Sequence, residues 1–457
     1  MNDLTTRFSR FVTQARYEDL PHEATRLITD AITDAIGCSL AGSREPITAI
    51  LARTLPTSTA PQDHLLLGST RRASAFEAAL YNGTCIHAID YDDTSHPSYS
   101  HPSAHIVPAI LAAGREFGAS GRDLVLAYAL GLELVGKLGR ALNTEHYLKG
   151  WHTTGTFGAI ASAAAAARLA RLDAAGTATA LAIAGSAAGG LRANFGTMTK
   201  PLHAGYAARS GLLAVMLTRE GFTASPDILD SRYGYLNVFA AAPPRLDAFD
   251  QLGAPWEIAT PYGIAIKPYP ACGSTHTAIE ASLALRAQIN GESIASVRVG
   301  TNELCSQTLI YSDPQTPLQA KFSMEFCVAA TLLRGEVNIA TFVPEVVADP
   351  AIRALMKRVT VEVDERVRFN SEHGTVVSVQ AASGRQLEAL VPLARGKPEH
   401  WLSRDELKAK FVDCARGSLS AARAGALFAH LQDIAQLPST DALLAPMEEA
   451  FSAMAAP

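Results

Sequence analysis

The chain has 457 residues, of which 48% are hydrophobic and 18% are charged, and its formal net charge at pH 7 is −5. This composition is typical of a globular protein long enough for two or three domains. Because the balance is slightly acidic and no basic run is present, the charge pattern does not favour binding to nucleic acid or to an anionic membrane.

Cysteines and hydrophobic stretches exclude several further classes of protein. The six cysteines are scattered without a CxxC pair, so a zinc ribbon or an iron–sulfur cluster lacks its usual ligand spacing. The first residues, MNDLTTRFSRF, contain no apolar segment like that of a secretory signal. The alanine-rich stretch 155–190 is interrupted too often by Gly, Ser, Thr and Arg for a membrane span. We therefore expect a cytoplasmic protein.

Most of the first 245 residues have apolar positions at helical spacing. Small residues dominate this region, as in ASAAAAARLA at 161–170, and small side chains let helix axes approach closely. The pattern predicts helices over residues 22–41, 103–119, 122–141, 155–171, 174–190 and 204–221.

After about residue 265 the pattern changes, and short segments alternate apolar and polar residues as strands do. Strands are predicted over 294–300, 359–365, 375–381 and 385–391, and Ser383-Gly384 suits a hairpin turn between the last two. Helices are predicted over 275–290, 319–333, 349–357, 404–413, 419–433 and 440–454.

These elements predict a mostly α fold with an α+β part. We expect a large all-helical domain over residues 1–265, completed by the C-terminal helices within 398–457. A smaller α+β lid domain is expected over residues 266–397. A cleft between the two domains is the natural place for a substrate.

Two lysines lie in stretches that carry no other charge. Lys200 is the only charged residue of NFGTMTKPLHAGYAA, and Lys267 is the only one of IATPYGIAIKPYPACGSTHTAI. Each is followed by proline, which favours an extended conformation for the lysine. A buried ammonium without a partner is costly, so we expect each lysine to contact an anion, with two cationic contacts for substrate carboxylates as the functional interpretation. Exposed surface lysines are the alternative.

Residues 87–105, HAIDYDDTSHPSYSHPSAH, concentrate four histidines and three aspartates. His87, Asp90 and Tyr91 have the i, i+3, i+4 spacing of one helix face, and His101 precedes a Pro-Ser helix start. Three interpretations remain open. His87, Asp90 and His101 suit a metal, although without a known ligand spacing. Imidazoles held by carboxylates suit proton transfer. The aspartates also suit helix capping, with His96 and His105 in a loop or on a helix surface.

The segment GWHTTGTFGA, residues 150–159, opens an apolar helix after His152. A helix N-terminus presents free N–H groups that suit an anion, which favours a site role for His152. Alternatively, Thr153 or Thr154 caps the helix and His152 is a buried histidine of the core.

Five segments taken in order, HAIDYDDT with HPS, GWHTTGTFGA, NFGTMTKPLHAGYAARSGLLA, KPYPACGSTH and QAKFSMEF, resemble the motifs of the MmgE/PrpD family. This family includes 2-methylcitrate dehydratase, cis-aconitate decarboxylase and iminodisuccinate epimerase. The resemblance implies a helical domain and a smaller α+β lid with the site between them, in a homodimer. It also implies that neither a metal nor an organic cofactor is needed.

The family motifs assign site roles by position in this sequence. His101 and His152 are expected to exchange protons, Lys200 and Lys267 to hold substrate carboxylates, and Asp90 to orient an imidazole. Contacts to the substrate are also expected from Thr94 and His276.

The function predicted first is a cofactor-independent lyase, a dehydratase, acting next to a carboxylate of a small di- or tricarboxylate such as 2-methylcitrate or cis-aconitate. Three alternatives remain: a racemase or epimerase of a dicarboxylate such as iminodisuccinate, a decarboxylase of a cis-aconitate-like acid, and a non-catalytic metabolite-binding homologue. The residue types do not decide among the three reactions, because each passes through a carbanion or enolate next to a carboxylate.

Overall fold

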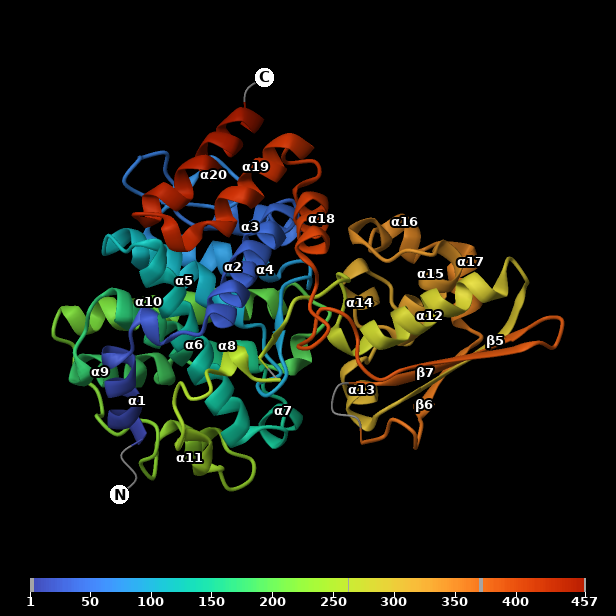
Figure 1. The fold of residues 1–457 in the computed structure, drawn as a ribbon, viewed down its shortest axis with the longest axis horizontal. Helices are drawn as coiled ribbons and strands as arrows, with labels where there is room; N and C mark the ends of the chain where they lie inside the picture. Colours follow the sequence, from blue (N-terminus) through green and yellow to red (C-terminus); the bar gives the residue numbers. More distant parts are fainter. Residues whose placement is uncertain (1–3, 262, 370–372, 456–457) are drawn as a thin grey trace.

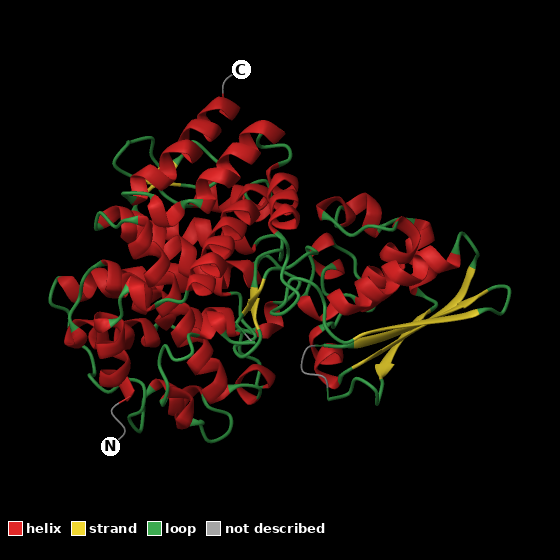
Figure 2. Cartoon of the chain, viewed as in Figure 1, coloured by secondary structure: helices red, strands yellow, loops and turns green. Residues whose placement is uncertain are grey.

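A computed structural model describes residues 4–261, 263–369 and 373–455 of the chain. A large helical domain lies beside a smaller α+β domain (Figure 1), and strands are largely confined to the smaller one (Figure 2). The predicted fold class, mostly α with an α+β part, is confirmed. Among the described residues, no helix is both long and apolar enough to cross a membrane.

The helical domain is built from the chain up to about Ile266 and from three C-terminal helices, which lie together in Figure 1. The helices are α1 (Leu4–Gln14), α2 (His22–Gly42), α3 (Pro46–Thr54), α4 (Ala75–His87), α5 (Pro102–Glu116), α6 (Gly121–Leu142), α7 (Glu145–Leu148), α8 (Thr153–Leu169), α9 (Ala174–Ser186), α10 (Thr199–Arg219), α11 (Tyr235–Phe239), α18 (Arg404–Ala415), α19 (Ala421–Gln432) and α20 (Thr440–Ala455). A short pair, β1 (His64–Leu65) and β2 (Arg72–Ala73), precedes α4.

Helix α8 forms the centre of this domain. All of its residues except Arg168 are buried, which explains the absence of a polar face in its sequence. Small residues bring α10 close to it, because a Cβ atom added to Gly211 would lie 2.5 Å from the backbone nitrogen of Ala163. The close approach expected from the alanine-rich sequence is therefore present, and it brings the first turns of α8 and α10 together.

Two hydrophobic cores divide the chain. The larger core draws on residues from Leu4 to Ile266 and again from Leu407 to Phe451, so the C-terminal helices pack into the helical domain. The second core draws on residues from Tyr269 to Val379.

The α+β domain has one sheet with helices on one of its faces (Figure 1). The strand order is β6-β5-β7-β8, with β5 parallel to β6 and antiparallel to β7. Gly384, with φ 89°, lies in the β7–β8 hairpin as predicted. The elements are α12 (His276–Ile289), β5 (Ile294–Thr301), α13 (Glu303–Thr308), α14 (Pro317–Ala320), α15 (Met324–Arg334), α16 (Pro344–Val347), α17 (Pro350–Met356), β6 (Val359–Val363), β7 (Thr375–Ala381) and β8 (Gln386–Val391).

One predicted helix, 319–333, is in fact two. Helix α14 ends at Ala320, and α15 starts at Met324 after Ser323, whose hydroxyl accepts a hydrogen bond from the Phe326 N–H. Side-chain capping by a serine starts a new helix here, an option that apolar spacing alone does not reveal.

A small strand pair lies where the chain passes from the helical domain into the α+β domain. Strand β3 (Thr94–Ser95), in the histidine-rich loop, pairs antiparallel with β4 (Ile264–Ala265), just before Lys267. Thr94 lies opposite Ala265, so the chain enters the α+β domain directly beside this loop.

Candidate active site

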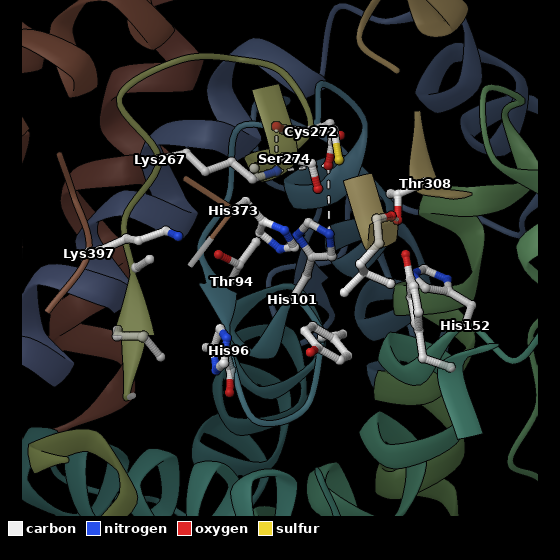
Figure 3. A pocket seen from close by; sticks show the side chains of 18 of the residues that line it. Thr94, His96, His101, His152, Lys267, Cys272, Ser274, Thr308, His373 and Lys397 are labelled. Atoms are coloured by element: carbon white, nitrogen blue, oxygen red, sulfur yellow. Dashed lines mark hydrogen bonds and ion pairs between the residues drawn. The ribbon is translucent and has the colours of Figure 1, made fainter. Parts of the chain in front are cut away.

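A cavity of about 110 Å³ lies between the two domains. A water molecule needs roughly 10–15 Å³ of such space, so the cavity has room for a small metabolite. Figure 3 shows Thr94, His101 and His152 of the helical domain around the same space as side chains of the α+β domain. The polar lining includes Asp90, Thr94, His96, His101, His152, Lys200, Lys267, Ser274, Thr308, His373 and Lys397.

At the wall of the cavity, Asp90 binds both lysines. Its Oδ1 atom accepts hydrogen bonds from Lys200 Nζ at 3.0 Å and from Lys267 Nζ at 2.9 Å. Lys267 Nζ also donates to the Asp90 carbonyl at 2.8 Å. Burial alone would raise the pKa of the Asp90 carboxyl, but the two ammonium charges outweigh it and hold this pKa well below its ordinary value. The anion that both lysines contact is thus Asp90.

The i, i+3 spacing of His87 and Asp90 predicted one shared helix face, and this prediction is wrong. Helix α4 ends at His87, and Asp90 has the left-handed φ of 54°. This conformation is uncommon for a residue other than glycine and turns the carboxylate toward the lysines.

The backbone around Asp90 is held from behind by Lys410 of α18. Lys410 Nζ donates to the Tyr91 carbonyl at 2.7 Å and lies 2.7 Å from Asp34 Oδ1. The Tyr91 hydroxyl donates to the Pro268 carbonyl at 3.1 Å, next to Lys267. A buried ion pair outside the cavity therefore supports the loop that carries Asp90.

Asp92 holds two histidines. Its oxygens lie 2.9 and 3.0 Å from His87 Nδ1, and Oδ2 lies 3.3 Å from His101 Nδ1. His87 Nε2 lies 2.9 Å from Lys200 Nζ. Since an ammonium only donates, Nε2 of His87 accepts this bond and Nδ1 carries the ring proton toward Asp92.

His101 and His152 are both neutral in this environment. Burial, reinforced by the charge of Lys200, lowers the pKa of His101 to about 3. The same two causes lower the pKa of His152 well below its ordinary value. A neutral imidazole accepts a proton, so each histidine is in the form that a general base requires.

Both histidines occupy the residue just before a helix. His101 is the N-cap of α5 and His152 is the N-cap of α8, so neither Thr153 nor Thr154 caps α8. Thr154 instead accepts a hydrogen bond at its hydroxyl from the backbone N–H of His101 at 3.1 Å. The two predicted motifs therefore contact each other directly.

Six of the seven predicted site residues line this one cavity: Asp90, Thr94, His101, His152, Lys200 and Lys267. The seventh, His276, does not line it, because its ring is buried against Tyr269 and its Nε2 atom lies 3.1 Å from the Ala271 carbonyl. Lys200 is not extended but helical, in the first turn of α10, where the following proline is tolerated.

For two further histidines the structure differs from the prediction, and for the three aspartates it shows which one caps a helix. His96 lines the cavity and is not merely a loop residue. His105 is not at a helix surface but fully buried, with Nδ1 3.2 Å from Ser162 Oγ. Asp93 is the capping residue of the cluster, since it accepts hydrogen bonds from the N–H of Ser103 at 3.0 Å and from its hydroxyl at 2.6 Å.

The metal interpretation fits these residues poorly. His87, Asp90, Asp92 and His101 place possible ligand atoms within 4.8 Å of one another. However, Asp90 Oδ1 already binds two ammonium groups and His87 Nε2 accepts from Lys200. A divalent cation at this point would meet two positive charges at close range, which is unfavourable in a buried site.

The sequence matches two family models, the MmgE/PrpD N-terminal domain over residues 6–246 and the MmgE/PrpD C-terminal domain over residues 269–433. The chain belongs to the MmgE/PrpD family.

Relatives that are named for an enzymatic activity match most of the chain. A human cis-aconitate decarboxylase is 30% identical over 358 residues, which cover 75% of this chain and 73% of that protein. A cis-aconitate decarboxylase-like protein of Aspergillus oryzae is 25% identical over 92% of both chains. A 2-methylcitrate dehydratase of Cupriavidus necator is 24% identical over 76% of this chain and 74% of its own.

Replacing Lys410 by methionine should destabilise the fold. The change leaves Asp34 buried without its ammonium partner, which typically costs about 3–5 kcal/mol. We expect this loss in the free energy of unfolding measured with urea, whereas Lys408→Met, an exposed lysine of the same helix, should change it by less than about 0.5 kcal/mol. Equal values for the two variants would show that the Asp34–Lys410 pair does not support the fold.

Stability should also fall in mild acid. The pKa of His101 is lowered in the folded state to about 3, so its contribution is complete above about pH 6.5 and is lost as pH falls from 6.5 toward 3. In that range His101→Gln should reduce the slope of unfolding free energy against pH by about 1.4 kcal/mol per pH unit. His96→Gln, in the same loop, is the control, and an unchanged slope for His101→Gln would contradict the assignment.

Proposed function

We propose that this protein is a cofactor-independent lyase, a dehydratase, that acts next to a carboxylate of a small di- or tricarboxylate. The observation that carries the proposal is the convergence of Lys200 and Lys267 on one carboxylate oxygen, within 3.0 Å, at the wall of the cavity between the two domains. Groups already arranged around a carboxylate are suited to hold a substrate carboxylate and the enolate that develops from it.

The charge balance of the site couples ligand binding to proton uptake. When the imidazoles are neutral, the carboxylates of Asp90 and Asp92 balance the ammonium groups of Lys200 and Lys267. Lys397 adds a further positive charge to the lining of the cavity. A bound substrate adds negative charge, which raises the pKa values of the nearby His101 and His152. The site thus supplies a base before the reaction and an acid once a proton has been taken up.

In the proposed reaction, one neutral histidine removes the proton next to the substrate carboxylate. Lys200 and Lys267 stabilise the negative charge that spreads onto the carboxylate oxygens. The other histidine, having taken up a proton on substrate binding, protonates the leaving hydroxyl, which departs as water. Asp92, 3.3 Å from His101 Nδ1, stabilises the protonated form of His101.

A neutral histidine that can act as a base favours dehydration over decarboxylation. Dehydration begins with removal of a proton, which needs a base, whereas decarboxylation begins with loss of carbon dioxide and needs a proton donor only afterwards. Decarboxylation is the second candidate, because relatives at 25–30% identity carry the name cis-aconitate decarboxylase. The relative from Cupriavidus necator is named 2-methylcitrate dehydratase, and 2-methylcitrate is a tricarboxylate. This name supports a di- or tricarboxylate as the substrate.

A panel of di- and tricarboxylates, followed by proton NMR in deuterated water, tests the reaction directly. We expect an olefinic product with loss of water from a hydroxylated acid. Release of carbon dioxide would contradict dehydration and show that the protein is a decarboxylase. Deuterium incorporation with inversion and without loss of a group would contradict the lyase and indicate an epimerase. Binding without turnover across the panel would indicate a non-catalytic homologue.

Lys267→Ala should impair catalysis beyond its effect on folding. If Lys267 binds a substrate carboxylate, its loss should cost about 3–5 kcal/mol of transition-state stabilisation. This corresponds to a decrease in kcat/KM on the order of a hundred- to several thousand-fold. Lys149→Ala, which changes an exposed lysine, is the control. A variant that loses stability but keeps kcat/KM would show that Lys267 serves only as the structural partner of Asp90.

We also propose that the active form is a homodimer. Tyr206 and Leu213 lie seven residues apart on one face of α10, with Met198 just before the helix, and they are 49%, 36% and 39% exposed. Large apolar side chains in one exposed row are typical of a protein–protein contact. Light scattering on the purified chain, whose mass is 48.3 kDa, gives the number of copies.

A further inference from the structure

A second histidine lies directly behind His152. His203, on α10, is 6% exposed, and its Nδ1 atom lies 2.9 Å from Nδ1 of His152. His152 lines the cavity, whereas His203 does not. His152 directly precedes α8 and His203 lies near the start of α10. No role for His203 follows from the functions assigned above.

The distance between the two nitrogens restricts their protonation. A hydrogen bond between imidazole nitrogens needs one nitrogen with a proton and one without. Two protonated nitrogens would repel each other, and two bare nitrogens would leave buried lone pairs facing. His203 therefore determines whether Nδ1 of His152 carries a proton, and Nε2 of His152 is left as the ring nitrogen available to a molecule in the cavity.

The surroundings of His152 differ from those of His101. His101 has the Asp92 carboxylate at 3.3 Å, but within the described part of the chain no carboxylate contacts the His152 ring. The groups around His152 include the rings of Phe195, His87 and His101, at 5.0, 6.0 and 6.4 Å, and the charge of Lys200. A full positive charge on His152 would be unfavourable there, so a proton taken up by His152 needs a way out.

The pair is also held in place by backbone. The Gly190 carbonyl accepts a hydrogen bond from the His152 N–H at 3.0 Å. Gly190 has φ 134°, and a Cβ atom at this position would lie 3.3 Å from the His203 ring. A glycine is required by both the backbone conformation and the space beside His203.

We propose that His203 is a positioning residue and proton-exchange partner of His152, an inference that rests on the acid/base role proposed for His152. When Nε2 of His152 takes a proton from the substrate, the proton on its Nδ1 moves to Nδ1 of His203. His203 then releases the proton on its own Nε2 toward solvent. Each ring binds one proton and gives up one, so neither ring retains a charge, and the reverse sequence resets the pair.

The first test reads the pair without turnover. In the full-length protein with 15N-labelled histidine, long-range proton–nitrogen NMR reports which ring nitrogen carries the proton. We expect a single tautomer for His152 in the unmodified chain and a mixture of both in His203→Leu. His203→Asn, which keeps a hydrogen-bonding group near the same place, should restore a single tautomer. An unchanged His152 spectrum in His203→Leu would overturn the proposal.

The second test uses the acid that the panel identifies as substrate. Both His203 variants should lower kcat at least tenfold while KM changes less than threefold, because neither side chain passes a proton on. His146→Gln, which alters a buried histidine away from the cavity, is the control for packing. Full kcat in His203→Asn would overturn the proton-exchange role. Full kcat in His152→Gln would instead refute the acid/base role of His152 and leave the tautomer measurement standing.

Discussion

The carboxylate of Asp90, shared by two buried ammonium groups, is the interaction on which the site depends. Its partners Lys200 and Lys267 lie 110 and 177 residues further along the chain. Three buried charges are tolerated only when they contact one another, so this contact fixes the end of α4, the start of α10 and the segment that enters the α+β domain. The left-handed backbone of Asp90 is part of the same constraint, since it directs the carboxylate at both lysines.

Each of the two histidines with a proposed catalytic role is supported by a different kind of partner. His101 has a carboxylate behind it, Asp92, and an imidazolium there is stabilised by a full negative charge. His152 has another imidazole behind it, His203, which favours transfer of a proton and not its retention. The difference suits two distinct tasks, protonation of a leaving group by one histidine and removal of a proton by the other.

The packing of small residues makes this arrangement geometrically possible. A Cβ atom on Gly158 of α8 would lie 2.7 Å from the His105 ring of α5 and 3.1 Å from the Cβ of Ala207 on α10. Helices α8, α10 and α5 therefore approach closely at the ends that carry His152, Lys200 and His101. Bulkier residues at these glycines would separate the helices and lengthen contacts of about 3 Å on which proton transfer depends.

The sequence by itself determined the fold class and the segments that carry chemistry, while the tertiary structure decided which of their residues meet. Apolar periodicity is a local property, so it predicted most helices and strands, and an isolated lysine in a neutral stretch indicated a buried anion contact for Lys200 and Lys267. The identity of that anion, the turn of the chain at Asp90 and the removal of His276 from the cavity depend on long-range packing. His203 and Lys410 were not recognised for the same reason, because their partners lie 51 and 319 residues away. A hydrogen bond between residues so far apart produces no recognisable pattern in the sequence.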